Sequence, residues 1–170
     1  ATPEEIQSTV KVMGGEDWQL WIEALDEAGV LAEGVKTVAY SYLGPKVTYG
    51  IYKDGTIGAA KRHIEATADV LHEFLQKKYH GEAYISLSKA LMTKASAVIP
   101  IFPLYALLLY RVMKEKGIHE GTIEQKQRLL KDMLYGDKPE LDEFRRLRPD
   151  NWGMREDVQA EVEALWDTVT

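Results

Sequence analysis

The stretch that decides the fold covers residues 38–45 and reads Val38-Ala39-Tyr40-Ser41-Tyr42-Leu43-Gly44-Pro45. It is short, uncharged, and rich in β-branched and aromatic residues, which is typical of a strand buried on both faces. We expect the strand to cover residues 35–43, because a Gly-Pro pair ends such a pattern.

A long helix is predicted to follow Gly55. Apolar residues recur there at steps of three and four over five turns, at Ile57, Ala60, Ile64, Ala68, Leu71 and Leu75. Asp54 or Thr56 is expected to cap its start. A second strand over residues 82–88 then completes a strand-helix-strand unit, which predicts two parallel strands joined by a right-handed crossover.

The candidate catalytic and binding residues belong to this strand-helix-strand unit or directly follow its strands. Tyr52 and Lys61 are nine residues apart, which on one continuous helix would place them on opposite faces. We therefore expect Tyr52 to lie outside the long helix, with the chain broken at Gly55. Tyr42 ends the first strand and residues 89–93 follow the second, and ligands of open parallel sheets bind beyond such strand ends.

The rest of the chain predicts mainly helices. They are expected over residues 4–13, from a cap at Asp17 onward, and over 103–116, 122–135 and 154–169. Thr122 and Gln125 have the spacing of a capping box. The apolar run over 95–110 is shorter than a membrane span and predicts a buried core helix.

The charged segment 136–150 is expected to be a surface excursion. Its basic cluster, residues 145–148, predicts a solvated turn.

Composition excludes several classes of function. A chain of 170 residues that is 45% hydrophobic predicts one domain with a sizeable core, and a net charge of −6 argues against non-specific nucleic-acid binding. The absence of cysteine excludes thiol chemistry and fits a reducing cytoplasm. The four histidines have no spacing typical of a metal site, so no metal is expected. The sequence holds no glycine-rich loop for a pyrophosphate.

Several segments of the sequence resemble the trans-2-enoyl-CoA reductases, a family that includes the V-type bacterial enoyl-acyl-carrier-protein reductases. These segments are residues 39–45, 51–58, 61, 64–68, 112–121 and 152–159. The likeness spans nearly the whole chain. It implies a helix-rich α/β fold with Rossmann-like parallel strands and flanking helices, as part of a larger doubly wound reductase.

The resemblance also implies a reaction and its residues. NADH would deliver hydride to the β-carbon of a trans-2-enoyl thioester, either enoyl-CoA or enoyl-acyl-carrier protein, in cytoplasmic fatty acid synthesis. The family pattern makes Tyr52 the proton donor and Lys61 the ligand of the nicotinamide ribose. It places Tyr42 on the thioester carbonyl, and Leu91, Met92 and Thr93 on the cofactor. For the basic cluster 145–148 it implies, as the alternative to a solvated turn, a contact with an acyl carrier protein or with the phosphates of coenzyme A. A nearby ammonium is expected to favour the ionised phenol and so to lower its pKa.

Other interpretations stay open beside this one. Without the resemblance, Tyr42 is an ordinary packing residue and Lys61 a solvated charge. A carbonyl reductase of the short-chain dehydrogenase type uses Tyr-x3-Lys, which neither Tyr52 nor Tyr42 reproduces on a helix. A non-catalytic, self-associating α/β fragment is a third possibility. Residues 1–170 are expected to form one catalytic segment that lacks the glycine-rich dinucleotide loop and a C-terminal region.

Overall fold

The computed structural model describes residues 1–137 and 139–169. The chain divides into two compact units, which we describe separately. The first contains residues 1–43 and 49–86, and the second contains residues 44–48 and the chain from 87 onward. Within the described residues, every helix is too short or too polar to cross a membrane.

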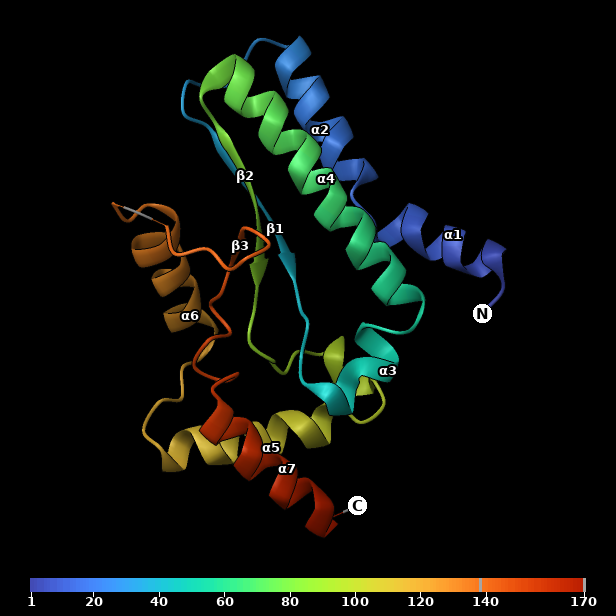
Figure 1. Ribbon diagram of the computed structural model, residues 1–170, viewed down its shortest axis with the longest axis vertical. Helices are drawn as coiled ribbons and strands as arrows, with labels where there is room; N and C mark the ends of the chain where they lie inside the picture. The colour runs from blue at the N-terminus through green and yellow to red at the C-terminus, as the bar shows by residue number, and fades with distance from the viewer. Residues whose placement is uncertain (138, 170) are drawn as a thin grey trace. The chain divides into compact units, whose positions relative to one another are not determined.

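The first unit is built around two strands and the long helix that joins them (Figure 1). Its elements are α1 (Pro3–Met13), α2 (Glu16–Glu27), β1 (Lys36–Ser41), α3 (Tyr49–Tyr52), α4 (Thr56–Tyr79) and β2 (Glu82–Leu87), whose last residue belongs to the second unit. β1 and β2 are parallel neighbours, so the predicted strand-helix-strand unit is confirmed.

The two strands differ in burial. β2 is buried from Ala83 onward, as a central parallel strand should be. β1 is only partly buried, and the side chain of Tyr40 is 57% exposed. The expectation that β1 is buried on both faces is therefore wrong for this chain.

The core of the first unit lies between α2 and α4, which run side by side (Figure 1). Ile22, Leu71, Leu75 and Ala83 form its buried cluster. The apolar stripe of α4 was predicted by its periodicity, and two of its members, Leu71 and Leu75, belong to this core. Trp21 on α2 lies outside this core and is 68% exposed.

The second unit is mostly helical. Its elements are η1 (Lys46–Thr48) and η2 (Ser96–Val98), both 3-10 turns, then α5 (Phe102–Glu115), α6 (Thr122–Arg128), the π-helical turn η3 (Leu129–Leu134), β3 (Arg146–Leu147) and α7 (Glu156–Val169). α5 packs against α7, and seven residues of α5 are buried. The helix predicted over residues 103–116 is confirmed by α5, whereas residues 95–101 of the apolar run lie outside this helix. Leu107 on α5 is 65% exposed.

Segment 136–150 is more than a surface excursion. β3 lies in it, and both Arg146 and Leu147 are buried. The Nε atom of Arg146 donates to Asp142 at 2.9 Å, and Arg148 donates through Nε and Nη2 to both carboxylate oxygens of Asp150. The prediction of a solvated basic turn is therefore wrong, because carboxylates from the same segment bind these two arginines.

One arginine ties the end of this segment to α6. The guanidinium of Arg128 makes two hydrogen bonds to the carboxylate of Glu120, at 3.0 and 2.7 Å. It also donates to the Pro149 carbonyl and to Asn151, and it stacks 4.2 Å from the centre of the Trp152 ring. A planar fork with five N–H donors can serve all of these partners at once.

Candidate functional site

Three residues singled out from the sequence meet in the first unit. The rings of Tyr42 and Tyr52 lie edge to face, with centroids 4.7 Å apart and planes at 78°. The ammonium nitrogen of Lys61 lies 5.6 Å from the centre of the Tyr42 ring and 5.2 Å from that of Tyr52. These are cation-π distances, so the charge of one lysine acts on both phenols.

The chain brings Tyr52 and Lys61 together by breaking between α3 and α4. Tyr52 is the last residue of α3, and the N–H groups of Lys53 and Asp54 both donate to the carbonyl of Tyr49, which ends that helix. Gly55 is the N-cap of α4 with extended backbone, and no side chain caps it. The break was predicted correctly, whereas the expected cap by Asp54 or Thr56 is wrong.

A glycine allows the two helices to approach so closely. A Cβ atom on Gly58 would lie 1.8 Å from the carbonyl oxygen of Lys53 and 2.4 Å from its carbon. These are backbone atoms, which cannot turn aside as a side chain would. Gly58 therefore sets how near the first turns of α4, and with them Lys61, come to the end of α3.

Burial controls the electrostatics of the site. It lowers the pKa of Lys61 to about 8, and the charge of Glu65 opposes this shift only in part. Burial also raises the pKa of Tyr52, whose side chain is 8% exposed. The expectation that the ammonium would lower the pKa of this phenol is therefore wrong, because desolvation of the phenolate is the larger effect.

The predicted cofactor residues Leu91, Met92 and Thr93 lie in the second unit, directly after β2. The Met92 N–H donates to the hydroxyl of Tyr110 at 2.9 Å, and the Thr93 N–H donates to the hydroxyl of Ser96 at 2.8 Å. Met92 and Thr93 are exposed, while Leu91 is half-buried. A ligand can therefore reach this segment from solvent.

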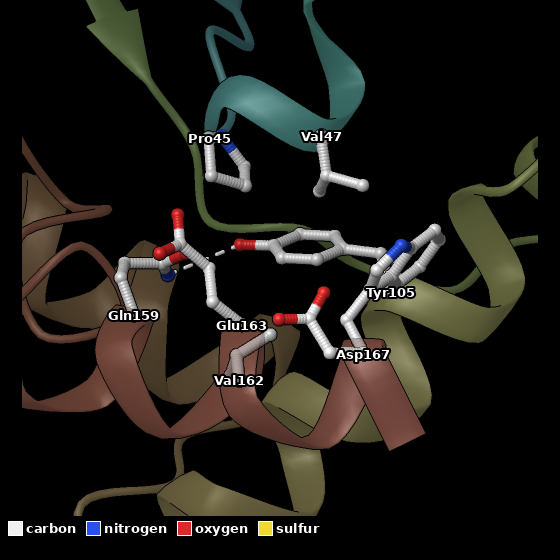
Figure 2. Close-up of a pocket in the computed structure, with 8 residues that line it drawn as sticks. Pro45, Val47, Tyr105, Gln159, Val162, Glu163 and Asp167 are labelled. Atoms are coloured by element: carbon white, nitrogen blue, oxygen red, sulfur yellow. Dashed lines mark hydrogen bonds between the residues drawn. The ribbon is translucent and has the colours of Figure 1, made fainter. Parts of the chain in front are cut away.

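The second unit also holds a pocket of about 210 Å³ between α5, α7 and the residues around η1 (Figure 2). Pro45, Val47 and Val162 give it an apolar wall, and Figure 2 shows the hydroxyl of Tyr105 directed at Gln159, whose Nε2 donates to it at 3.2 Å. Trp166 and two carboxylates, Glu163 and Asp167, complete the lining. This charge disfavours a phosphate, so the pocket suits a neutral or cationic group.

Sequence reasoning missed several polar residues of the second unit. Lys89 is 3% exposed, and its ammonium donates to the carbonyl of Glu120 and lies 4.9 Å from the centre of the Tyr110 ring. A lysine just after a strand and a tyrosine on an apolar helix are common features of ordinary packing. The sequence placed Lys89 in the segment that follows a strand end, but it carried no signal for the contact of Lys89 with Tyr110.

The chain is similar to one enzyme family over most of its length. Residues 1–135 match the family model described as the trans-2-enoyl-CoA reductase catalytic region, and residues 141–170 match the one described as the enoyl reductase FAD binding domain. An enoyl-acyl-carrier-protein reductase (NADH) of Flavobacterium johnsoniae is 56% identical over all of this chain. A trans-2-enoyl-CoA reductase (NADH) of Clostridium perfringens is 58% identical over the same span.

Solved structures give the same result. A crystal structure of the Clostridium acetobutulicum trans-2-enoyl-CoA reductase in complex with NAD superposes on this chain with a TM-score of 0.97 at 48% identity. It matches 100% of this chain and 44% of the other. The chain likewise spans 43% of the length of each of the two bacterial relatives.

Proposed function

Because this chain belongs to the trans-2-enoyl-CoA reductase family, we propose that it carries the proton-donating side of an NADH-dependent enoyl-thioester reductase. The observation that carries the proposal is the position of Lys61, within 5.6 Å of the centres of two phenol rings that themselves touch. A buried phenol beside a cation of lowered pKa is a typical arrangement for proton transfer.

Each of the three residues has a distinct role in this proposal. Tyr52 donates a proton to C2 of the substrate, and its raised pKa keeps the phenol protonated at neutral pH. Tyr42 donates a hydrogen bond to the thioester carbonyl, whose oxygen gains negative charge as the enolate forms. Lys61 stabilises the phenolate that Tyr52 becomes, because its ammonium lies 5.2 Å from the centre of that ring.

NADH, when bound, supplies the hydride that adds to C3 of the enoyl thioester. Lys61 would hold the ribose as a hydrogen-bond donor, and Leu91, Met92 and Thr93 would hold the cofactor through backbone groups and a hydroxyl. The position of these three residues after the carboxyl end of β2 supports this assignment. The description of the second family model names FAD, but the proposed reaction assigns no step to a flavin.

The substrate class follows from the same family. We assign trans-2-enoyl thioesters of coenzyme A or of acyl carrier protein, and a place in fatty acid synthesis in the cytoplasm. The pairing of Arg146 with Asp142 and of Arg148 with Asp150 disfavours this basic cluster as the site for the thioester's phosphates. The pocket beside α7 is also disfavoured as a site for these phosphates, because its carboxylates, Glu163 and Asp167, would repel them.

The experiment compares full-length enzymes that carry this segment, with crotonyl-CoA and NADH as substrates. Tyr52→Phe should lower kcat/KM by about 10²- to 10⁴-fold, because a general acid contributes a factor of that size. Tyr40→Phe on β1, where the side chain is 57% exposed, is the matched control and should retain activity. Full activity in Tyr52→Phe would refute the proposed mechanism.

The two alternatives give different results in the same assay. A carbonyl reductase would oxidise NADH with acetoacetyl-CoA and leave crotonyl-CoA unchanged. A non-catalytic fragment would turn over neither thioester in any assembly.

A further inference from the structure

We propose that Tyr110 is a positioning residue that fixes the shape of residues 90–93 for the cofactor; this inference rests on the proposed function. Its hydroxyl donates to the Ala90 carbonyl at 3.0 Å and accepts from the Met92 N–H at 2.9 Å. One oxygen atom thus bridges two backbone groups in the segment that follows β2.

The bridge joins a loop to a rigid element. Tyr110 lies on α5, where seven residues are buried. Ser96 also binds the segment, accepting from the Thr93 N–H at 2.8 Å and donating to the Leu91 carbonyl at 3.1 Å, but it belongs to the same loop. Ser96 can therefore shape the loop from within, while Tyr110 fixes it relative to the helix.

The ring of Tyr110 is itself held in place. The His119 ring packs against it edge to face, with centroids 4.9 Å apart, and the Lys89 ammonium lies 4.9 Å from its centre. Burial raises the pKa of Tyr110, so its hydroxyl stays protonated and continues to donate to Ala90. Both functions of the hydroxyl, donor and acceptor, are thus available over the physiological pH range.

The loop that Tyr110 holds lies where a ligand is expected to bind. In open parallel sheets ligands bind beyond the carboxyl ends of strands, and residues 90–93 follow the end of β2. In this loop Leu91 is half-buried, while Met92 and Thr93 are exposed. A ligand on this loop would therefore meet backbone groups already fixed by Tyr110, which lowers the entropic cost of binding.

The test uses Tyr110→Phe in the full-length enzyme, because phenylalanine keeps the ring packing and removes only the bridging oxygen. We expect the Kd for NADH to rise by about 5- to 30-fold, corresponding to the loss of one or two hydrogen bonds. The KM for crotonyl-CoA should stay within about twofold of its original value. Tyr135→Phe, at a side chain that is 68% exposed, is the matched control.

Amide hydrogen exchange separates positioning from general stability. In Tyr110→Phe the Met92 amide should exchange at least about tenfold faster, while the Thr93 amide, which Ser96 holds, should change little. Unchanged exchange at Met92 would overturn the inference. Faster exchange with an unchanged Kd for NADH would overturn it too, because the hydroxyl would then serve the fold alone.

Failure of the proposed function remains distinguishable. A parent enzyme that binds NADH without reducing crotonyl-CoA refutes the reaction, and the Kd comparison still decides the role of Tyr110. A parent that does not bind NADH at all refutes both proposals.

Discussion

The phenol rings of Tyr42 and Tyr52 meet edge to face with centroids 4.7 Å apart, and the ammonium of Lys61 lies within 5.6 Å of the centre of each. The two rings belong to different elements, since Tyr42 follows β1 and Tyr52 ends α3. Their contact fixes the end of the strand against the short helix. The two hydroxyls can therefore serve one substrate in different roles.

Tyr42→Phe should reduce turnover without abolishing proton donation. It removes the hydrogen bond proposed for the thioester carbonyl, and loss of one such donor typically lowers kcat by about 10²- to 10³-fold. Steady-state kinetics with crotonyl-CoA, beside Tyr52→Phe and the double variant, would measure it. If the fold reductions in kcat of the two single variants multiply in the double variant, the two residues act independently. If the double variant has the kcat of the slower single variant, they act as a unit.

The activity should fall as pH rises through about 8. Lys61 carries its charge below this pKa and loses it above, so kcat/KM is expected to decline by up to about tenfold per pH unit on the alkaline side. Lys61→Arg keeps its charge to far higher pH and should shift this limb upward. Titration of lysine side chains by NMR with 13C-labelled lysine would assign the pKa directly, and an ordinary value near 10.5 for Lys61 would contradict the prediction.

The same pKa predicts how stability depends on pH. The pKa of Lys61 is lower in the folded state, so the unfolded chain binds more protons between about pH 8 and 10.5. Stability from this group should therefore rise as pH increases through that window. Urea unfolding at both ends of the window would show the rise, and Lys61→Met should make it smaller.

Gly58→Ala should loosen the junction of α3 and α4. The added methyl would lie 1.8 Å from a backbone oxygen, and overpacking of this kind costs about 1–3 kcal/mol. Gly50→Ala in α3 is the matched control, because a Cβ there meets nothing within 4 Å. Equal unfolding free energies for the two variants in urea would show that the close approach at Gly58 is unimportant.

Arg128→Lys should destabilise the second unit although it keeps the charge. An ammonium cannot bind Glu120 through two bonds and also reach Pro149 and Asn151, and each buried polar group left without a partner costs about 1–3 kcal/mol. Arg111→Lys, in an exposed pair with Glu115, should change stability by less than about 1 kcal/mol. Chemical denaturation of both variants checks the difference.

Periodicity predicted the long elements of this fold well. The stripe of α4 and the apolar run of β2 are strong signals, and Gly55 marked the break that separates Tyr52 from α4. The meeting of Tyr42, Tyr52 and Lys61 was predicted in outline, because strand ends and a helix start leave few other positions for them. The roles of these residues stay predictions until the variants are measured.

Two of the predicted helix caps were wrong. Asp17 and Thr122 were expected to cap helices, yet glycines occupy the N-caps, Gly15 at α2 and Gly121 at α6. A Cβ on Gly15 would lie 2.1 Å from the hydroxyl of Thr67 on α4, and the Gly15 N–H donates to His63. Contacts with a distant part of the chain thus decided where α2 begins, and a local motif does not contain them.

Charge patterns misled in segment 136–150 for a similar reason. A run of arginines predicts a solvated turn when each charge is considered alone. In the structure the carboxylate of Asp142 accepts from both the backbone N–H and the guanidinium of Arg146, which allows the arginine to be buried. Such pairing depends on the path of the backbone, which the order of charges does not specify.

The junction between α3 and α4 should respond differently to substitutions than to insertions or deletions. Among single substitutions between Tyr52 and Lys61, one at Gly58 would bring a Cβ atom within 1.8 Å of a backbone oxygen and so disturb the path of the chain. A codon inserted into or deleted from the first turn of α4 would turn Lys61 by about 100° around the helix axis and move it about 1.5 Å along it. The phenols would then face a different residue. The number of residues between Tyr52 and Lys61, more than their identity, therefore keeps the ammonium beside the two tyrosines.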